Sequence, residues 1–391
     1  MQDSCFKLKF NIILAIVLYI GLSTILFCKY VMRLTTIYGC MTFAYAIFLF
    51  LVLFTIHKYR ERYCKILVSD VTLIVMLAII SVAIIFVQYS FDPMQIMVDR
   101  WSAIHNVIGA MFQGNFPYSA QTHLGGYASP FPIWMIFHIP FYLLNNVGLS
   151  IVVGMLLYIL SLSKIAGVRG AITALVLFAF NVNFWYEVSV RSDMITNFLL
   201  LCAFINYMWR NQINYSTRTW FAAICCGLWL STRISTMLPL LVFLFPEYMR
   251  QSKTKKIMIP LVIIFVFMLT FLPLAVWDFN YLVGAEYNPF VLQTRQGKLI
   301  DSVIVVSLTI IMACNWKNDY TKMLIFSALS LILLFSVATI HSMYSYGTWT
   351  ELFNSMYDIT YLDMSLPFII TVLSLEQKRY SQNECKDFIS I

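Results

Sequence analysis

Long apolar runs, separated by short polar stretches, fill the sequence from end to end. A run of about 20 apolar residues can cross a bilayer as a helix, which satisfies its own backbone hydrogen bonds in hydrocarbon. The pattern therefore predicts an all-α fold, a polytopic bundle of about twelve transmembrane helices that forms a single domain over 1–391, with both termini on one side. The predicted spans are 10–28, 38–56, 67–89, 147–163, 171–187, 193–209, 220–233, 235–248, 257–277, 300–315, 322–340 and 362–376.

Composition supports a membrane protein. Of the side chains, 61% are hydrophobic and 11% are charged, and the mean hydropathy is +0.80, whereas soluble domains carry about 25% charged residues. The first apolar run follows Lys7 and Lys9 but lacks a small-residue cleavage site. We therefore interpret it as a retained span and not as a signal peptide.

The stretch SPFPIWMIFHIPFYLL, residues 129–144, is apolar enough to cross but contains Pro130, Pro132 and Pro140. If it does not cross, 19 of the 26 basic residues fall on one face of the membrane, and if it crosses, only 10 do. Because cytoplasmic loops carry an excess of Lys and Arg, the first layout is favoured. Residues 129–144 are therefore predicted to lie along the outer surface or to enter the membrane and return.

Residues 90–146 then form a long external segment, predicted to be catalytic and to contain amphipathic and re-entrant helices that lie in the membrane. Trp101, Ile104 and Ile108 stand at helical spacing, which is typical of an amphipathic helix in the interface. The sequence QGNFPY should end that helix. Further on, residues 220–248 are predicted to form two short spans with Arg233 at their outer turn, because the basic loops on either side should share one face.

Several motifs follow one another in a recognisable order. After Asp99 come SAIHNVIGAMFQ, the break GNFPY and the proline-rich stretch YASPFPIWMIFHIP, and later the hairpin GLWLSTRISTMLPLLVFLFP. This order, over about residues 67–376, resembles that of the GT-C superfold glycosyltransferases, multi-pass enzymes that use polyprenyl-phosphate sugars. Two features depart from the commoner pattern: two spans precede the helix that leads into the acidic loop, and Ser-Pro-Phe-Pro replaces a double proline.

The resemblance implies a membrane glycosyltransferase. Such an enzyme would move a monosaccharide from a polyprenyl-phosphate donor to a lipid-linked or polysaccharide acceptor on the non-cytoplasmic face, by an inverting displacement. Asp99 is the predicted catalytic base, which takes a proton from the acceptor hydroxyl. Composition alone would instead make Asp99 a solvated acid beside Arg100 in a surface turn.

The phosphate of the donor needs cations, and Arg pairs with phosphate oxygens bidentately. Arg233, Arg295 and Lys298 are predicted to bind it. Arg295 and Lys298 could instead anchor lipid headgroups, and Arg233 could be a cation at a helix end that extends to the interface.

Four further residues are predicted to bind substrate. Arg191 and Asp193 would order the site or contact sugar hydroxyls, unless they pair with each other. His123 and Tyr127 lie on the external segment near an acceptor, although a single loop histidine is more often structural. The sequence defines no metal site and no certain cofactor, but leaves room for a divalent metal near Asp99 and Asp193.

Two other functions compete with this prediction: a multi-pass polysaccharide polymerase or ligase, and a lipid-linked sugar transporter or flippase. A polymerase usually places its large loop late in the chain, and a transporter should show internal repeats, which this sequence lacks. The expected partners are the donor, a glycan or glycolipid acceptor and membrane lipids, with no nucleic acid. The predicted location is a bacterial inner membrane, with cytoplasmic termini and the active site facing outside.

Overall fold

Helices form nearly all of the regular structure in the computed structural model, which describes residues 2–59, 69–295, 297–353 and 356–376. The longer helices are α1 (Gln2–Val31), α2 (Tyr38–Lys58), α3 (Asp70–Tyr89), α6 (Ser150–Ala179), α8 (Met194–Arg210), α11 (Lys253–Gly284), α13 (Leu299–Asn315) and α14 (Tyr320–Tyr346). The shorter ones are α4 (Arg100–Phe112), α5 (Pro132–Leu143), α7 (Val182–Ser189), α9 (Thr219–Leu230), α10 (Met237–Met249) and α12 (Pro289–Thr294). A last helical segment covers Ile359–Glu376. The predicted all-α class is confirmed.

The chain is an integral multi-pass membrane protein, with fewer evident crossings than predicted. Within the described ranges, seven helices are long and apolar enough to span a bilayer, or eight if α7 and α8, bent by 118°, count as one. The predicted number of twelve is too high by this criterion. Three of the predicted spans coincide with short apolar helices of 10–17 residues, namely α9, α10 with its preceding turn, and α13. At about 1.5 Å per residue these are shorter than a 30 Å hydrocarbon core.

α6 folds back on itself. Its backbone is broken at Gly167, which has φ 76° and ψ 175°, a conformation that glycine adopts without strain. The rings of Tyr158 and Phe178 lie 5.8 Å apart, whereas a straight helix would separate them by about 30 Å. The predicted spans 147–163 and 171–187 therefore overlap the two arms of one bent helix, and the second arm ends at Ala179, before α7.

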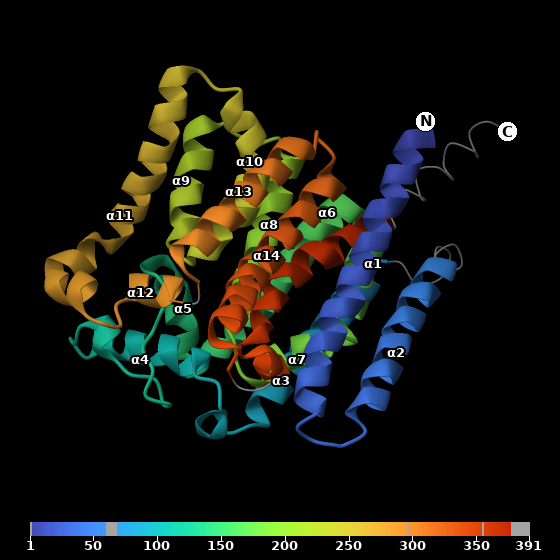
Figure 1. The fold of residues 1–391 in the computed structure, drawn as a ribbon, viewed down its shortest axis with the longest axis horizontal. Helices are drawn as coiled ribbons and strands as arrows, with labels where there is room; N and C mark the ends of the chain where they lie inside the picture. Colours follow the sequence, from blue (N-terminus) through green and yellow to red (C-terminus); the bar gives the residue numbers. More distant parts are fainter. Residues whose placement is uncertain (1, 60–68, 296, 354–355, 377–391) are drawn as a thin grey trace.

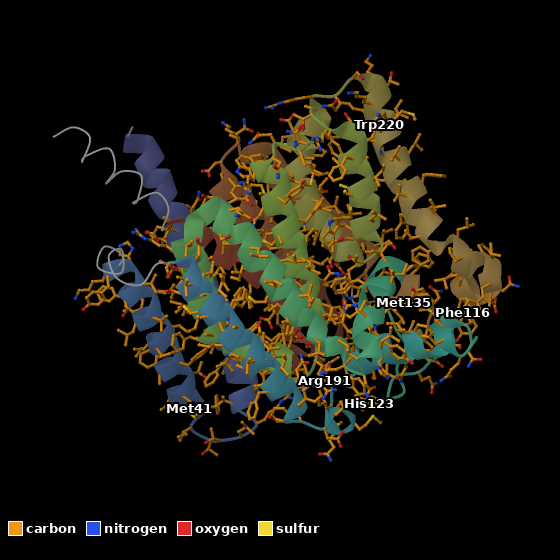
Figure 2. All side chains as sticks on the ribbon, turned by 180° about the vertical axis from the view of Figure 1, so that it is seen from behind. Met41, Phe116, His123, Met135, Arg191 and Trp220 are labelled. Carbon is orange, nitrogen blue, oxygen red and sulfur yellow. The ribbon has the colours of Figure 1, made fainter. Side chains whose placement is uncertain are left out.

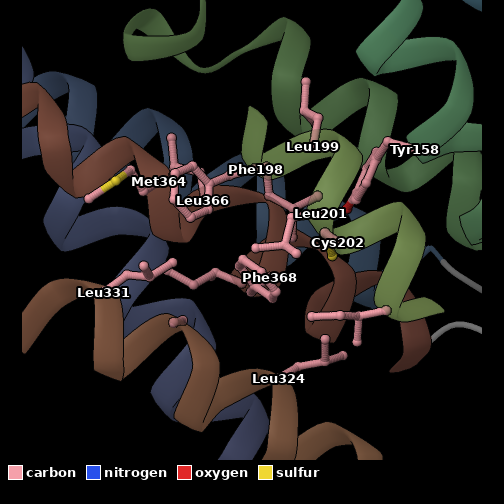
Figure 3. Close-up of a cluster of buried hydrophobic side chains, with 14 of the residues drawn as sticks. Tyr158, Phe198, Leu199, Leu201, Cys202, Leu324, Leu331, Met364, Leu366 and Phe368 are labelled. Carbon is pink, nitrogen blue, oxygen red and sulfur yellow. The ribbon is translucent and has the colours of Figure 1, made fainter. Parts of the chain in front are cut away.

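The main core lies where α6, α8, α14 and the last helix meet. Figure 3 shows Tyr158, Phe198 and Phe368 among the buried apolar side chains that fill this contact. The hydroxyl of Tyr158 donates a hydrogen bond to the Pro367 carbonyl at 3.0 Å. In a membrane, such packing and interhelical hydrogen bonding, and not water exclusion, hold helices together.

The bundle has two chemically different ends. In Figure 1, the start of α1 and the turn between α10 and α11 lie at the top, while the loop after α1 and the helices α4 and α12 lie lower. The turn at the top is basic and contains Arg250, Lys253, Lys255 and Lys256. Glu376 lies 3.2 Å from His57 at the end of α2, so both ends of the described chain lie at this basic end. Figure 2 labels Trp220 there and places Arg191 and His123 toward the opposite end.

The segment 90–146 packs part of its apolar surface against the rest of the protein. α4 is confirmed as a helix that ends before Gly114, but Trp101 and Ile104 on it are buried. Trp134 on α5 is also buried, and all three belong to a second apolar cluster that includes side chains of α11. With 12 residues, α5 is too short to cross. Other apolar side chains of α4 and α5 remain exposed, so contact of these two helices with the membrane stays a prediction.

Candidate functional site

Asp99 lies immediately before α4 and is half-buried. Its Oδ2 accepts a hydrogen bond from the Thr122 hydroxyl at 2.9 Å. A backbone bridge between Gln121 and Tyr127 closes the loop that carries Thr122. This loop packs so closely that a Cβ on Gly126 would lie 2.7 Å from Asp99 Oδ2. No described residue donates to Oδ1, so one oxygen is fixed and the other can accept a proton.

His123 and Tyr127 lie on the same loop, so the structure brings three predicted site residues together. His123 Nε2 donates to the Ile96 carbonyl at 2.8 Å, and its Nδ1 lies 2.7 Å from Ser102 Oγ. Both ring nitrogens are therefore engaged by protein in this conformation, which favours the structural interpretation of His123. The hydroxyl of Tyr127 accepts from Gln121 Nε2 at 2.9 Å.

Arg233 and Asp193, both predicted to bind substrate, form a buried ion pair. Only 7% of Arg233 is exposed, and its Nη2 lies 2.6 Å from Asp193 Oδ2. The indole Nε1 of Trp134 donates to the same oxygen at 2.6 Å. Because Asp193 neutralises Arg233, this guanidinium is not an open cation at the outer rim.

Arg191 does not pair with Asp193, so that alternative is wrong. Its Nη2 donates to the Gln88 carbonyl at 2.8 Å, at the end of α3. The residue is buried and has φ 52°, in the left-handed region that few non-glycine residues adopt. Gly148 leaves space for it, since a Cβ there would lie 2.7 Å from Arg191 Cβ. Through these contacts Arg191 connects the turn after α7 to the end of α3.

A charged network around Arg100 is absent from the sequence prediction. The Nη1 of Arg100 lies 3.1 Å from Glu187 Oε1 and from Ser192 Oγ, and its Nη2 lies 2.6 Å from Asp358 Oδ2 and from Thr360 Oγ1. Glu187 is fully buried. Glu187 lies in the apolar run FWYEVSV. Because an ionisable residue in such a run is costly in a membrane, this pattern could have identified Glu187 from the sequence.

The network also keeps the carboxyl group of Asp358 ionised. Loss of hydration raises the pKa of Asp358, but the Arg100 guanidinium and the hydrogen bonds from Thr360 outweigh it and hold the pKa below its ordinary value. A lowered pKa keeps the carboxylate ionised at neutral pH. The contact between Asp358 and Arg100 is therefore lost only when the pH falls through that lowered pKa.

Arg295 and Lys298 are exposed at the junction of α12 and α13. Two contacts tie this junction to the loop around Asp99. Gln293 Nε2 donates to the Ser129 carbonyl at 2.8 Å, and the rings of Tyr127 and Tyr287 stack with centroids 5.3 Å apart. The exposed cations and the candidate base therefore lie on connected segments at one end of the bundle.

The suggested divalent metal near Asp99 and Asp193 finds no ligand set. Among the described residues, no group of three or more His, Cys, Asp and Glu side chains is arranged to hold a metal ion. Oδ2 of Asp193 accepts from Arg233 and Trp134, while Oδ2 of Asp99 accepts from Thr122. The two carboxylates belong to different clusters.

Comparison with known proteins gives one structural likeness. No protein-family model matches the chain, and no curated protein sequence matches it. The fold is similar to the crystal structure of ArnT from Cupriavidus metallidurans bound to undecaprenyl phosphate, at 12% sequence identity and a TM-score of 0.49. The match covers 78% of this chain and 60% of that protein.

Proposed function

We propose that this protein is a membrane glycosyltransferase that uses a polyprenyl-phosphate sugar. The observation that carries the proposal is the arrangement of Asp99. Thr122 donates a hydrogen bond to its Oδ2, whereas its Oδ1 accepts no hydrogen bond from any of the described residues. The exposed Arg295 and Lys298 lie on the segment joined to that loop. A positioned carboxylate and nearby free cations are what such a transfer requires.

In the proposed reaction, the acceptor hydroxyl attacks the anomeric carbon from the face opposite the phosphate. The bond between the acceptor oxygen and the anomeric carbon forms while the bond between that carbon and the phosphate oxygen breaks. The hydroxyl proton passes to Asp99 Oδ1, and the electron pair of the broken bond stays on the phosphate. Arg295 and Lys298 stabilise the negative charge that develops there.

Arg100 acts as a positioning residue in this proposal. Its guanidinium is fixed by Glu187 and Asp358, and Asp99 is its neighbour in sequence. The first turn of α4 is therefore held in place from two sides. A catalytic carboxylate needs such support, because small displacements of a reacting group reduce the rate strongly.

The distribution of charge supports an external active site. The basic turn with Arg250, Lys253, Lys255 and Lys256 lies at the end opposite Asp99 (Figure 1). By the positive-inside rule that end faces the cytoplasm. The proposed site then faces the other side, which in a bacterial inner membrane is the outside, and segment 90–146 is its catalytic part.

Transfer from synthetic polyprenyl-phosphate sugars tests the proposal. Purified protein in proteoliposomes is incubated with a panel of such donors and with lipid extracted from bacterial cells, and products are identified by mass spectrometry. We expect a glycosylated lipid or glycan and free polyprenyl phosphate. Transfer only from diphosphate-linked glycans would instead indicate a polymerase or ligase, and no transfer from any donor would contradict the enzymatic proposal.

Removing both exposed cations should weaken the use of the donor. We expect the double variant Arg295→Gln/Lys298→Gln to raise the donor KM by about tenfold or more, because hydrogen bonds to charged groups contribute about 1.5–3 kcal/mol. Arg33→Gln is the matched control, since Arg33 is exposed on the loop after α1, and Figure 1 shows that loop well apart from α12. An equal change in both variants would show a general charge effect and no phosphate site.

Gly126→Ala should slow transfer while the protein stays folded. The new Cβ would lie 2.7 Å from Asp99 Oδ2 and 3.3 Å from Thr122 Oγ1, so the loop or the carboxylate must move. We expect a rate about 10- to 100-fold lower. Gly39→Ala, at a helical position with no atom within 4 Å, should behave as wild type, and an active Gly126→Ala enzyme would show that this packing does not position the base.

A further inference from the structure

A cleft of about 520 Å³ lies along α4 and the loop that follows it. This is within the range of about 300–1,000 Å³ that is usual for small-molecule sites. Four amide side chains line it: Asn106, Gln113, Asn115 and Gln121. None of its lining residues is Lys, Arg, Asp or Glu.

The amides offer unused hydrogen-bonding groups. The side chains of Gln113 and Asn115 are exposed and bond to none of the described residues. Asn106 donates from Nδ2 to the Gln121 carbonyl at 2.8 Å, and its Oδ1 remains available. An amide both donates and accepts, as does a sugar hydroxyl, so this wall matches a polyol.

Aromatic rings supply the apolar part of the lining. Phe116 and Tyr142 face the cleft. Tyr142 is supported by Phe112, whose ring is stacked on it at 5.6 Å, and Phe116 contacts Trp277 at 6.1 Å. The faces of aromatic rings accept the C–H faces of pyranose rings. A lining that combines amide and aromatic side chains is therefore suited to bind a carbohydrate.

The cleft has no cation to attract an acidic group. Its one titratable side chain besides Tyr142 is His105. Burial, and then the charge of Arg191, lower the pKa of His105, so it is neutral near pH 7. A phospholipid headgroup or an acidic glycan would find no charged partner here.

The cleft and the candidate site share one loop. Gln121 lines it, and the next residue, Thr122, donates to Asp99. We propose that this cleft binds the acceptor, and that the acceptor is an uncharged carbohydrate whose attacking hydroxyl extends past Gln121 to Asp99. The assignment as acceptor rests on the proposed function, whereas carbohydrate binding itself does not.

Equilibrium binding of trisaccharides, without any transfer, tests the inference. Protein in lipid nanodiscs, free of sugar-based detergent, is examined by saturation-transfer NMR and by titration with maltotriose, triacetylchitotriose and trigalacturonate. We expect a neutral trisaccharide to bind, trigalacturonate to bind at least tenfold more weakly, and Gln113→Ala/Asn115→Ala to weaken neutral binding about tenfold or more. Gln95→Ala, an exposed amide of the same segment that does not line the cleft, should bind as wild type.

Three results would overturn the inference: no neutral trisaccharide binds, trigalacturonate binds as tightly, or the double variant and Gln95→Ala are affected equally. Because neither altered amide has a hydrogen bond to lose, the double variant should melt at the wild-type temperature. Binding without transfer from any donor would refute the proposed function but retain a carbohydrate site. Transfer without the expected binding would refute only the proposed carbohydrate site in the cleft.

Discussion

Asp99→Asn should lower the turnover of the purified enzyme by about 10²- to 10⁴-fold, the usual contribution of a general base. The amide keeps the shape of the side chain and its contact with Thr122, but it cannot take the acceptor proton. The thermal midpoint should stay close to that of the wild type. Initial rates of polyprenyl phosphate release, measured at saturating donor, give the comparison.

Asp92→Asn is the matched control for this variant. Asp92 is an exposed acid of the same segment, and its side chain caps a short turn by accepting from the Met94 amide at 3.0 Å. Asparagine can keep that cap. Turnover should therefore stay at the wild-type level, and an equal loss in both variants would mean that the charge of the segment, and not a base, is required.

Arg100→Met should strongly destabilise the protein. It leaves Glu187, which is fully buried, without its cation. Removal of one partner of a buried ion pair costs about 3–5 kcal/mol. We expect a much lower midpoint of thermal or detergent-induced unfolding, and partial recovery in Arg100→Met/Glu187→Gln, which removes the uncompensated charge.

Arg250→Met provides the comparison for an exposed pair. Arg250 lies 2.6 Å from Glu247, but 62% of its side chain is exposed, and such pairs contribute about 0–1 kcal/mol. If the two arginine variants lose similar stability, the Arg100 network is not the anchor of α4 that its contacts indicate.

Local signals in the sequence predicted much of the fold. The end of α4 at QGNFPY, the separate helices on either side of Arg233, and the helical class follow from turn residues and apolar runs, which act over a few positions. The packing of Trp101, Ile104 and Trp134 against α11 could not be predicted in this way, because an apolar face suits lipid and protein equally. The break between the predicted spans 147–163 and 171–187, in contrast, falls where α6 folds back at Gly167.

The site was only partly predictable for a related reason. Asp99, His123 and Tyr127 lie within 30 residues of one another, and the structure groups them. Arg233 finds Asp193 40 positions away, and Arg100 finds Asp358 258 positions away, so these pairs depend on how distant helices pack. A search for ionisable residues inside apolar runs would have identified Glu187 and Asp363, both fully buried.

The most direct test of the central claim is the fate of the bond between sugar and phosphate in a single turnover. Proteoliposomes that contain wild-type protein or Asp99→Asn receive a donor labelled in both sugar and phosphate, and the two labels are followed by chromatography and mass spectrometry. Our account predicts that the wild type releases one polyprenyl phosphate for each sugar joined to an acceptor, and that Asp99→Asn releases almost none. Donor that crosses the bilayer with sugar and phosphate still joined, equally with both proteins, would contradict it.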